Sequence, residues 1–103
     1  MNSELLESFD QQAMALGFDE VLDRVWPPHK VVELHSHPFD AMAVVTQGEM
    51  WLKVGEQTRH LRVGDTFELD RDTPHAERYG AEGATYRVAR RNGVRILGPG
   101  SGH

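Results

Sequence analysis

Residues 33–41 read Glu-Leu-His-Ser-His-Pro-Phe-Asp-Ala and contain two histidines that are two positions apart. Side chains of an extended strand alternate between its faces, so His35 and His37 share one face, and Glu33 shares it with them. Two imidazoles on one face can each offer a nitrogen to the same metal ion, at roughly 2.0–2.1 Å. This stretch therefore predicts a strand that carries part of a metal site.

Segments with strand-like alternation recur through the rest of the chain, at intervals of about 8–12 residues with turn residues between them. The predicted strands are 21–26, 31–37, 41–46, 50–54, 58–63, 66–69, 75–79 and 84–90. Prolines end the first two, because proline cannot donate a ladder hydrogen bond. Turns are expected at Gln47-Gly48 and between Gly80 and Gly83. This rhythm predicts an all-β antiparallel sandwich or barrel rather than alternating β-α units.

The N-terminal residues 3–16 have a different periodicity, which predicts a short helix. Leu5, Phe9 and Leu16 fall near the three- and four-residue spacings of one apolar stripe, and Gly17 is a plausible stop. We expect the stripe to pack on the barrel or on a second subunit. The expected organisation is a helical appendage at 1–18, a barrel at 19–97 and a disordered tail at 98–103.

Composition excludes several classes of function. The chain has 103 residues, enough for one domain, and no cysteine for disulfides or thiol catalysis. Its 16 acidic and 11 basic residues give a net charge of −5, which argues against a nucleic-acid surface. There is no long apolar run for a membrane span and no signal-peptide pattern at the start, so we expect a cytoplasmic protein without membrane partners.

Two features suggest contact with a second copy of the chain. The apolar helix stripe needs cover, and Trp26 and Trp51 add large apolar area, so we expect a homodimer. Late in the chain, basic residues cluster that fit a solvated strand edge or ion pairs between subunits: Arg87, Arg90, Arg91 and Arg95.

Two motifs in this sequence resemble those of small single-domain cupins. The first cupin motif is His-x-His, a glutamate three or four residues later, and a glycine after six more. Here His35, His37 and Gly48 match, but Ala41 stands where the glutamate belongs. The second motif runs from a glycine to a histidine, and Gly64 and His75 have its spacing.

The second motif also departs from the family pattern. Asp70 and Asp72 replace the proline and glycine of its loop, and Tyr79 stands at its closing asparagine. The resemblance covers roughly residues 21–91. It implies a double-stranded β-helix, or jelly-roll cupin barrel, with the short helix as an N-terminal addition.

The resemblance further implies that His35, His37 and His75 converge inside the barrel on one divalent transition metal. Three imidazoles suit Fe, Zn, Ni, Cu or Mn, with open positions for water or substrate. The alternative is a barrel in which the three histidines bond to one another, to water or to a ligand.

The missing glutamate raises the question of which carboxylate replaces it. By alternation, Glu33 shares the face of His35, and Glu77 shares the face of His75. Asp40 is adjacent to the lost position, and a bend at Pro38-Phe39 would turn it inward. We predict Glu77 and Glu33 as the acid/base residues, with Glu77 first as ligand, outer partner or substrate contact.

Three classes of function fit these features. The first is a metal-dependent enzyme of dioxygenase type, or a hydrolytic one with zinc, acting on a small organic molecule. The second is a non-catalytic sensor or carrier that binds a small ligand, and the third is a storage or structural protein. Fold alone does not choose among them.

Overall fold

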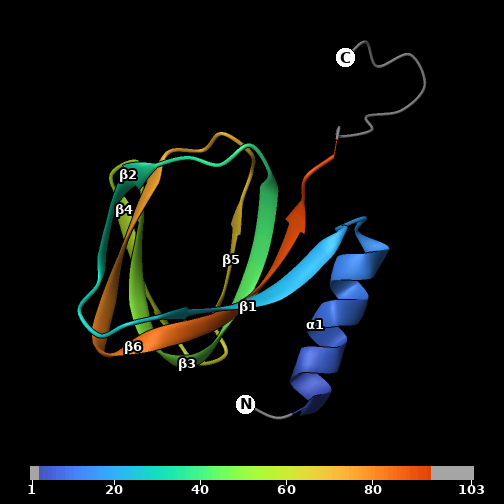
Figure 1. The fold of residues 1–103 in the computed structure, drawn as a ribbon, viewed down its shortest axis with the longest axis horizontal. Coiled ribbons are helices and arrows are strands. Elements are labelled where there is room, and N and C mark those ends of the chain that lie inside the picture. The colour runs from blue at the N-terminus through green and yellow to red at the C-terminus, as the bar shows by residue number, and fades with distance from the viewer. Residues whose placement is uncertain (1–2, 94–103) are drawn as a thin grey trace.

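The computed structural model describes residues 3–93 as an antiparallel β-barrel with one helix beside it (Figure 1). The predicted tail at 98–103 lies outside the described residues. The elements are α1 (Ser3–Ala15), β1 (Glu20–Trp26), β2 (Val31–His35), β3 (Asp40–Val54), β4 (Gln57–Arg62), β5 (Thr66–Leu69) and β6 (His75–Arg91). The strand order is β1-β6-β3-β4, with β2 also on β6 and β5 also on β3. The predicted all-β double-stranded β-helix with a short N-terminal helix is confirmed.

Two long bent strands, β3 and β6, pair with each other. Each of the other four strands pairs with one of these two: β4 and β5 with β3, and β1 and β2 with β6. The sequence predicted turns at Gln47-Gly48 and Gly80–Gly83, and both predictions were wrong, because each segment continues as strand. The described residues therefore contain six strands and not eight. Register shifts interrupt the β3–β6 ladder on both sides of Gly48. Such bulges bend a strand and let one strand serve both sheets.

Glycine is required at this crossing. Gly48 has a φ of +71°, and a Cβ there would lie 2.1 Å from the carbonyl oxygen of Gly83. Gly83 has a φ of +70°, and a Cβ there would overlap the carbonyl oxygen of Trp26. The glycines that read as turn signals thus mark close backbone approaches between strands.

The interior is filled by alternating side chains from both sheets. The largest completely buried ones are Tyr79, Met50, Leu61 and Val45. Trp26 also lies inside, where it stacks on Tyr79 at 5.2 Å and donates a hydrogen bond to the hydroxyl of Tyr86. Part of the apolar area that the sequence analysis assigned to a subunit interface is thus packed against the core of the barrel.

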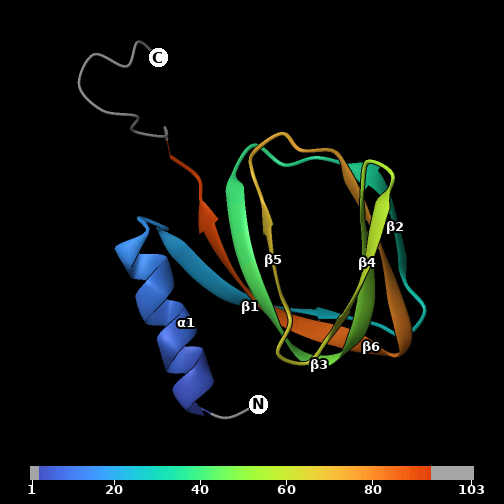
Figure 2. The ribbon, with the colours of Figure 1, turned by 180° about the vertical axis from the view of Figure 1, so that it is seen from behind.

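Helix α1 packs on the outside of the barrel (Figure 2). Phe9 and Ala13 are buried there against Met42, Val44 and Ala89. The helix ends at Ala15, beside the predicted stop Gly17. The positive φ of Gly17 allows a C-terminal cap in which the N–H groups of Gly17 and Phe18 donate to carbonyls of the last turn. The apolar stripe of the helix was expected to pack on the barrel or on a second subunit, and in the structure it packs on the barrel.

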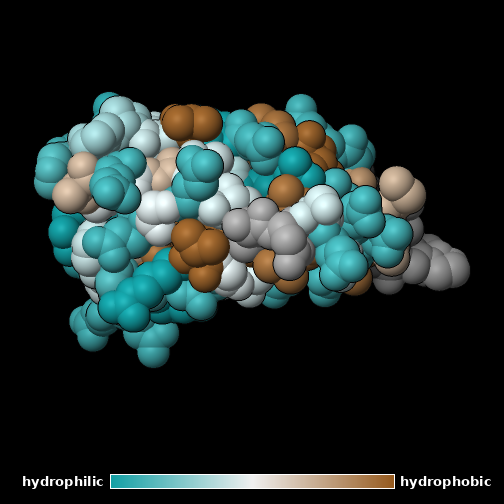
Figure 3. Space-filling view, turned by 90° about the horizontal axis from the view of Figure 1, so that it is seen from below, coloured by the Kyte–Doolittle hydropathy of each residue, from teal (hydrophilic) through white to brown (hydrophobic). Residues whose placement is uncertain are grey.

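The surface carries scattered exposed apolar side chains. The most exposed are Met14 in α1, Val25 in β1 and Leu34 in β2. On the face drawn in Figure 3, hydrophobic side chains lie in separate small groups between hydrophilic ones. The one helix of the described residues is too short and too polar to cross a membrane. The homodimer stays a prediction.

Candidate metal centre

Three histidines meet inside one end of the barrel. His35 ends β2, His37 lies two residues further on, and His75 begins β6 opposite His35. Their ring centroids are 4.3–5.2 Å apart, and one nitrogen from each ring lies within 4.8 Å of the other two. The structure therefore brings together the three residues that the sequence placed at a metal site.

Main-chain carbonyls orient two of the rings. The Nδ1–H of His35 donates to the carbonyl of Glu33 at 2.7 Å, and the Nδ1–H of His75 donates to the carbonyl of Thr73 at 2.9 Å. This hydrogen bonding assigns the proton to Nδ1 and leaves the lone pair on Nε2. A backbone partner at Nδ1 is the usual support of a metal-ligating histidine.

The third ring is held differently. His37 stacks on Phe39, with centroids 4.8 Å apart and planes inclined by 12°. Burial lowers the pKa of His37, and electrostatic interactions with the neighbouring His35, His75, Arg90 and Arg24 lower it further. The neutral imidazole, which is the form that binds metal, is therefore favoured.

Glu77 is the carboxylate that reaches this centre. It follows His75 by two residues on β6, is only 6% exposed, and its Oε2 lies 3.8 Å from Nε2 of His35. Burial and neighbouring groups, Glu77 among them, raise the pKa values of Tyr79 and Tyr86, so both phenols stay neutral beside it. A buried carboxylate needs a cation or a donor, and a metal held by one nitrogen of each of the three imidazoles fits that need.

Glu33 does not reach the centre, contrary to the prediction from strict alternation. The β2–β6 register shifts between Val32 and His35, so the side chain of Glu33 is exposed. It lines a separate outer groove with Trp51 and Lys53. Glu33 contributes its main-chain carbonyl to the orientation of His35, and the structure does not support the predicted acid/base role of its side chain.

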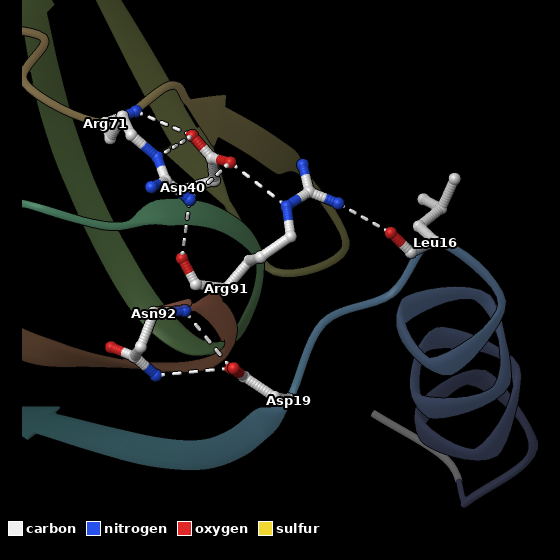
Figure 4. A network of polar contacts seen from close by, with 6 residues as sticks. All are labelled: Leu16, Asp19, Asp40, Arg71, Arg91 and Asn92. Atoms are coloured by element: carbon white, nitrogen blue, oxygen red, sulfur yellow. Dashed lines mark hydrogen bonds and ion pairs between the residues drawn. The ribbon is translucent and has the colours of Figure 1, made fainter. Parts of the chain in front are cut away.

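Asp40 does not line the cavity beside the histidines either, and its carboxylate lies in an ion-pair network (Figure 4). Its buried carboxylate accepts hydrogen bonds from Arg71 and from Nε of Arg91 at 3.0 Å. Arg91 also donates to the carbonyl of Leu16 at the end of the helix. Asp40 thus ties the start of β3 to the end of β6 and to α1, and it is not a substitute for the missing glutamate.

A cavity of about 80 Å³ opens onto the three histidines. Ala41 lines it, so the position where the family motif has glutamate does face the centre. Glu77 and apolar side chains, among them Phe39, line it as well. Three converging imidazole nitrogens and one adjacent carboxylate are a donor set that fits a divalent transition metal.

Two arginines, Arg24 and Arg90, also line this cavity, and the sequence analysis missed both. Arg90 was grouped with Arg87 and Arg91, which instead form ion pairs with aspartates on the outside of the barrel and at its rim. Arg95 lies outside the described residues. Alternation along β6, which places Arg90 on the face of Tyr86, was the available signal.

The comparisons with known proteins agree with this architecture. Residues 23–88 match the sequence family described as "Cupin domain". No curated protein matches the sequence closely enough to show a relationship.

Several solved structures are similar. A cupin protein from Bacteroides fragilis has a TM-score of 0.63 and 17% identity, over 82% of this chain and 74% of that one. KdgF from Halomonas sp. has a TM-score of 0.60 and 19% identity, over 75% and 69%. An HTH_3 family transcriptional regulator from Vibrio cholerae has a TM-score of 0.62 and 19% identity, over 73% of this chain but 43% of that one. Identities this low show a shared fold.

Proposed function

The chain belongs to the cupin domain family, and we propose that it is a metal-binding cupin that acts as a metal-dependent enzyme on a small organic molecule inside the barrel. The observation that carries this proposal is the convergence of three imidazole nitrogens beside the buried carboxylate of Glu77. Such a centre is costly to build without a cation, since the carboxylate has no guanidinium or ammonium ion pair among residues 3–93.

The residues that line the cavity would have different roles in binding and in proton transfer. His35, His37 and His75 would hold one divalent ion, which is Fe, Zn, Ni, Cu or Mn. When bound, iron would supply dioxygenase-type redox chemistry, and zinc would supply a Lewis acid that acidifies water to a pKa of about 7. Glu77 is placed to accept or return a proton at the histidine side of the cavity. Apolar walls such as Phe39 and Leu69 limit the access of water.

A second candidate is a non-catalytic sensor that binds a small ligand in the same cavity. The similarity to part of a transcriptional regulator from Vibrio cholerae supports this candidate, because a domain of the same fold occurs there within a regulatory protein. In that case the histidines and Glu77 would bind ligand or metal without turnover.

Metal content and turnover test the proposal in two steps. Untagged protein should carry about one transition metal ion per chain by elemental analysis, and His75→Gln should lose it. His60→Gln is the matched control, because His60 is exposed and pairs with Glu49 far from the centre. Absence of metal in the wild type after loading with Fe, Zn, Ni, Cu and Mn would overturn the proposal.

The second step separates enzyme from sensor. Metal-loaded protein is incubated with a library of small metabolites, and each compound is followed by mass spectrometry. Consumption by the wild type and not by His75→Gln supports an enzyme. Saturable binding with no consumption of any bound compound supports the sensor instead.

A further inference from the structure

Two guanidinium groups line the same cavity as the three histidines. Arg24 comes from β1 and Arg90 from β6. Each lies over an aromatic ring that also lines the cavity: Arg24 over Trp26 at 4.8 Å and Arg90 over Phe39 at 4.7 Å. Ring stacking orients a guanidinium while leaving its N–H groups at the edge free to donate.

These two arginines lack the close carboxylate partners that other arginines of the chain have. Arg71, Arg87 and Arg91 each form ion pairs at 3.0–3.3 Å. Arg24 has no ion pair or hydrogen bond among the described residues, 3–93. Arg90 has only a 3.5 Å contact with a half-exposed glutamate, and its buried Nε has no hydrogen-bond partner in that part of the chain.

The charges around the cavity favour an anion. Two guanidinium groups line it together with a single carboxylate, that of Glu77. This leaves an excess of one positive charge, and a divalent metal would raise it further. The excess is local, because the chain as a whole carries a net charge of −5. A positive, partly enclosed cavity attracts small anions even though the net negative charge of the protein surface repels them.

We propose that the molecule bound in this cavity is a small organic carboxylate, which Arg24 and Arg90 recognise. The planar fork of a guanidinium matches a carboxylate with two parallel N–H···O bonds, and Arg24 and Arg90 both line the cavity. The cavity, at about 80 Å³, is roughly half the ~150 Å³ that admits benzene, so a ligand of a few non-hydrogen atoms fits. This inference deepens the proposed function, on which it rests, by naming the substrate class.

Glycolate and its neutral isostere glycolamide test the proposal directly. The full-length protein is stripped of metal and titrated with each, while the side-chain Nε–H resonances of its arginines are followed by NMR. We expect glycolate to shift the Arg90 resonance saturably, with a Kd on the order of 1 mM, and glycolamide to bind at least tenfold more weakly. The comparison uses wild-type protein, so it stands whether or not any variant folds.

Variants assign the binding to the two arginines. Arg90→Gln and Arg24→Gln should each weaken glycolate binding by about tenfold or more, read from the intrinsic fluorescence of Trp26 in a Trp51→Phe background. Arg62→Gln is the matched control, because Arg62 is exposed on β4 and lies outside the cavity. It should bind glycolate as the parent does.

Three results would overturn the inference. Equal binding of glycolate and glycolamide would show that charge is not recognised, and no binding of glycolate would show that the arginines do not recognise a small carboxylate. Tighter binding of inorganic phosphate than of glycolate would assign the site to a different anion. The titration is made without metal and repeated with zinc-loaded protein, so failure of this inference and failure of metal binding are read separately.

Discussion

Replacing Glu77 with glutamine should weaken metal binding by about 10–100-fold. The Nδ1 atoms of His35 and His75 already donate to main-chain carbonyls, so Glu77 is not needed to orient those rings. Its Oε2 lies 3.8 Å from Nε2 of His35, on the side of the ring that would face the metal. Glutamine keeps the size of the side chain and removes only its charge.

The expected loss corresponds to about 1.4–2.8 kcal/mol of binding free energy, at 1.4 kcal/mol for each factor of ten. The electrostatic interaction available is larger than this. Two unit charges 4 Å apart interact by about 4 kcal/mol at an effective dielectric constant of ~20. Glu77 is 6% exposed, so solvent screens it little, while the cost of burying its charge offsets part of the gain.

Competitive titration against a chelator measures the affinities of the wild type and three variants. Glu33→Gln is the matched control, since this exposed glutamate lies two residues from His35 but outside the cavity, and its affinity should equal the wild type. Ala41→Glu restores the carboxylate of the family motif. It should gain little, because two carboxylates would crowd the same ion and repel each other.

The opposite pattern would refute this reasoning. If Glu77→Gln binds metal as the wild type does and Ala41→Glu binds it more tightly, then Glu77 has not taken over the lost position. The metal would in that case rest on the three histidines alone. Circular dichroism of each variant distinguishes lost affinity from lost structure.

Four further outcomes are expected. The pKa of His37 is lowered in the folded protein, so protonation favours the unfolded chain as the pH falls below about 6.5. Both Tm and metal content should therefore fall on acidification, and unchanged metal content after dialysis at about pH 4.5 would contradict this. Gly48→Ala should cost at least about 2 kcal/mol in urea unfolding, and more than Gly55→Ala, because both have positive φ but only the first Cβ meets backbone. Asp40→Asn should cost about 2–3 kcal/mol in the same assay, below the ~3–5 of a fully buried pair because both arginine partners reach solvent. The protein should be a dimer at about 100 μM by light scattering, because part of the apolar helix stripe stays exposed, and a monomer would reject this.

The sequence alone determined the class of fold and the three histidines. Alternation along a strand and the placement of prolines are short-range properties. The strand predicted at 31–37 was therefore largely correct, although it ends at His35, and the start of β6 at His75 was predictable. The spacing shared with cupins then placed His35, His37 and His75 together. The helix and its stop at Gly17 were predictable for the same reason, because a helix cap involves only neighbouring residues.

Only the tertiary structure decided what depends on register between distant strands. From the sequence alone, Gly48 predicts a turn. In the structure, the backbone of Gly83, which is far away in sequence, lies close against Gly48, and the two strands predicted on either side of Gly48 are one strand. Glu33 should face inward by alternation, but a shift of register against β6 turns it outward. Arg24 and Arg90 meet at one cavity because β1 pairs with β6, and no local pattern in the sequence shows that two positions so far apart share a ladder.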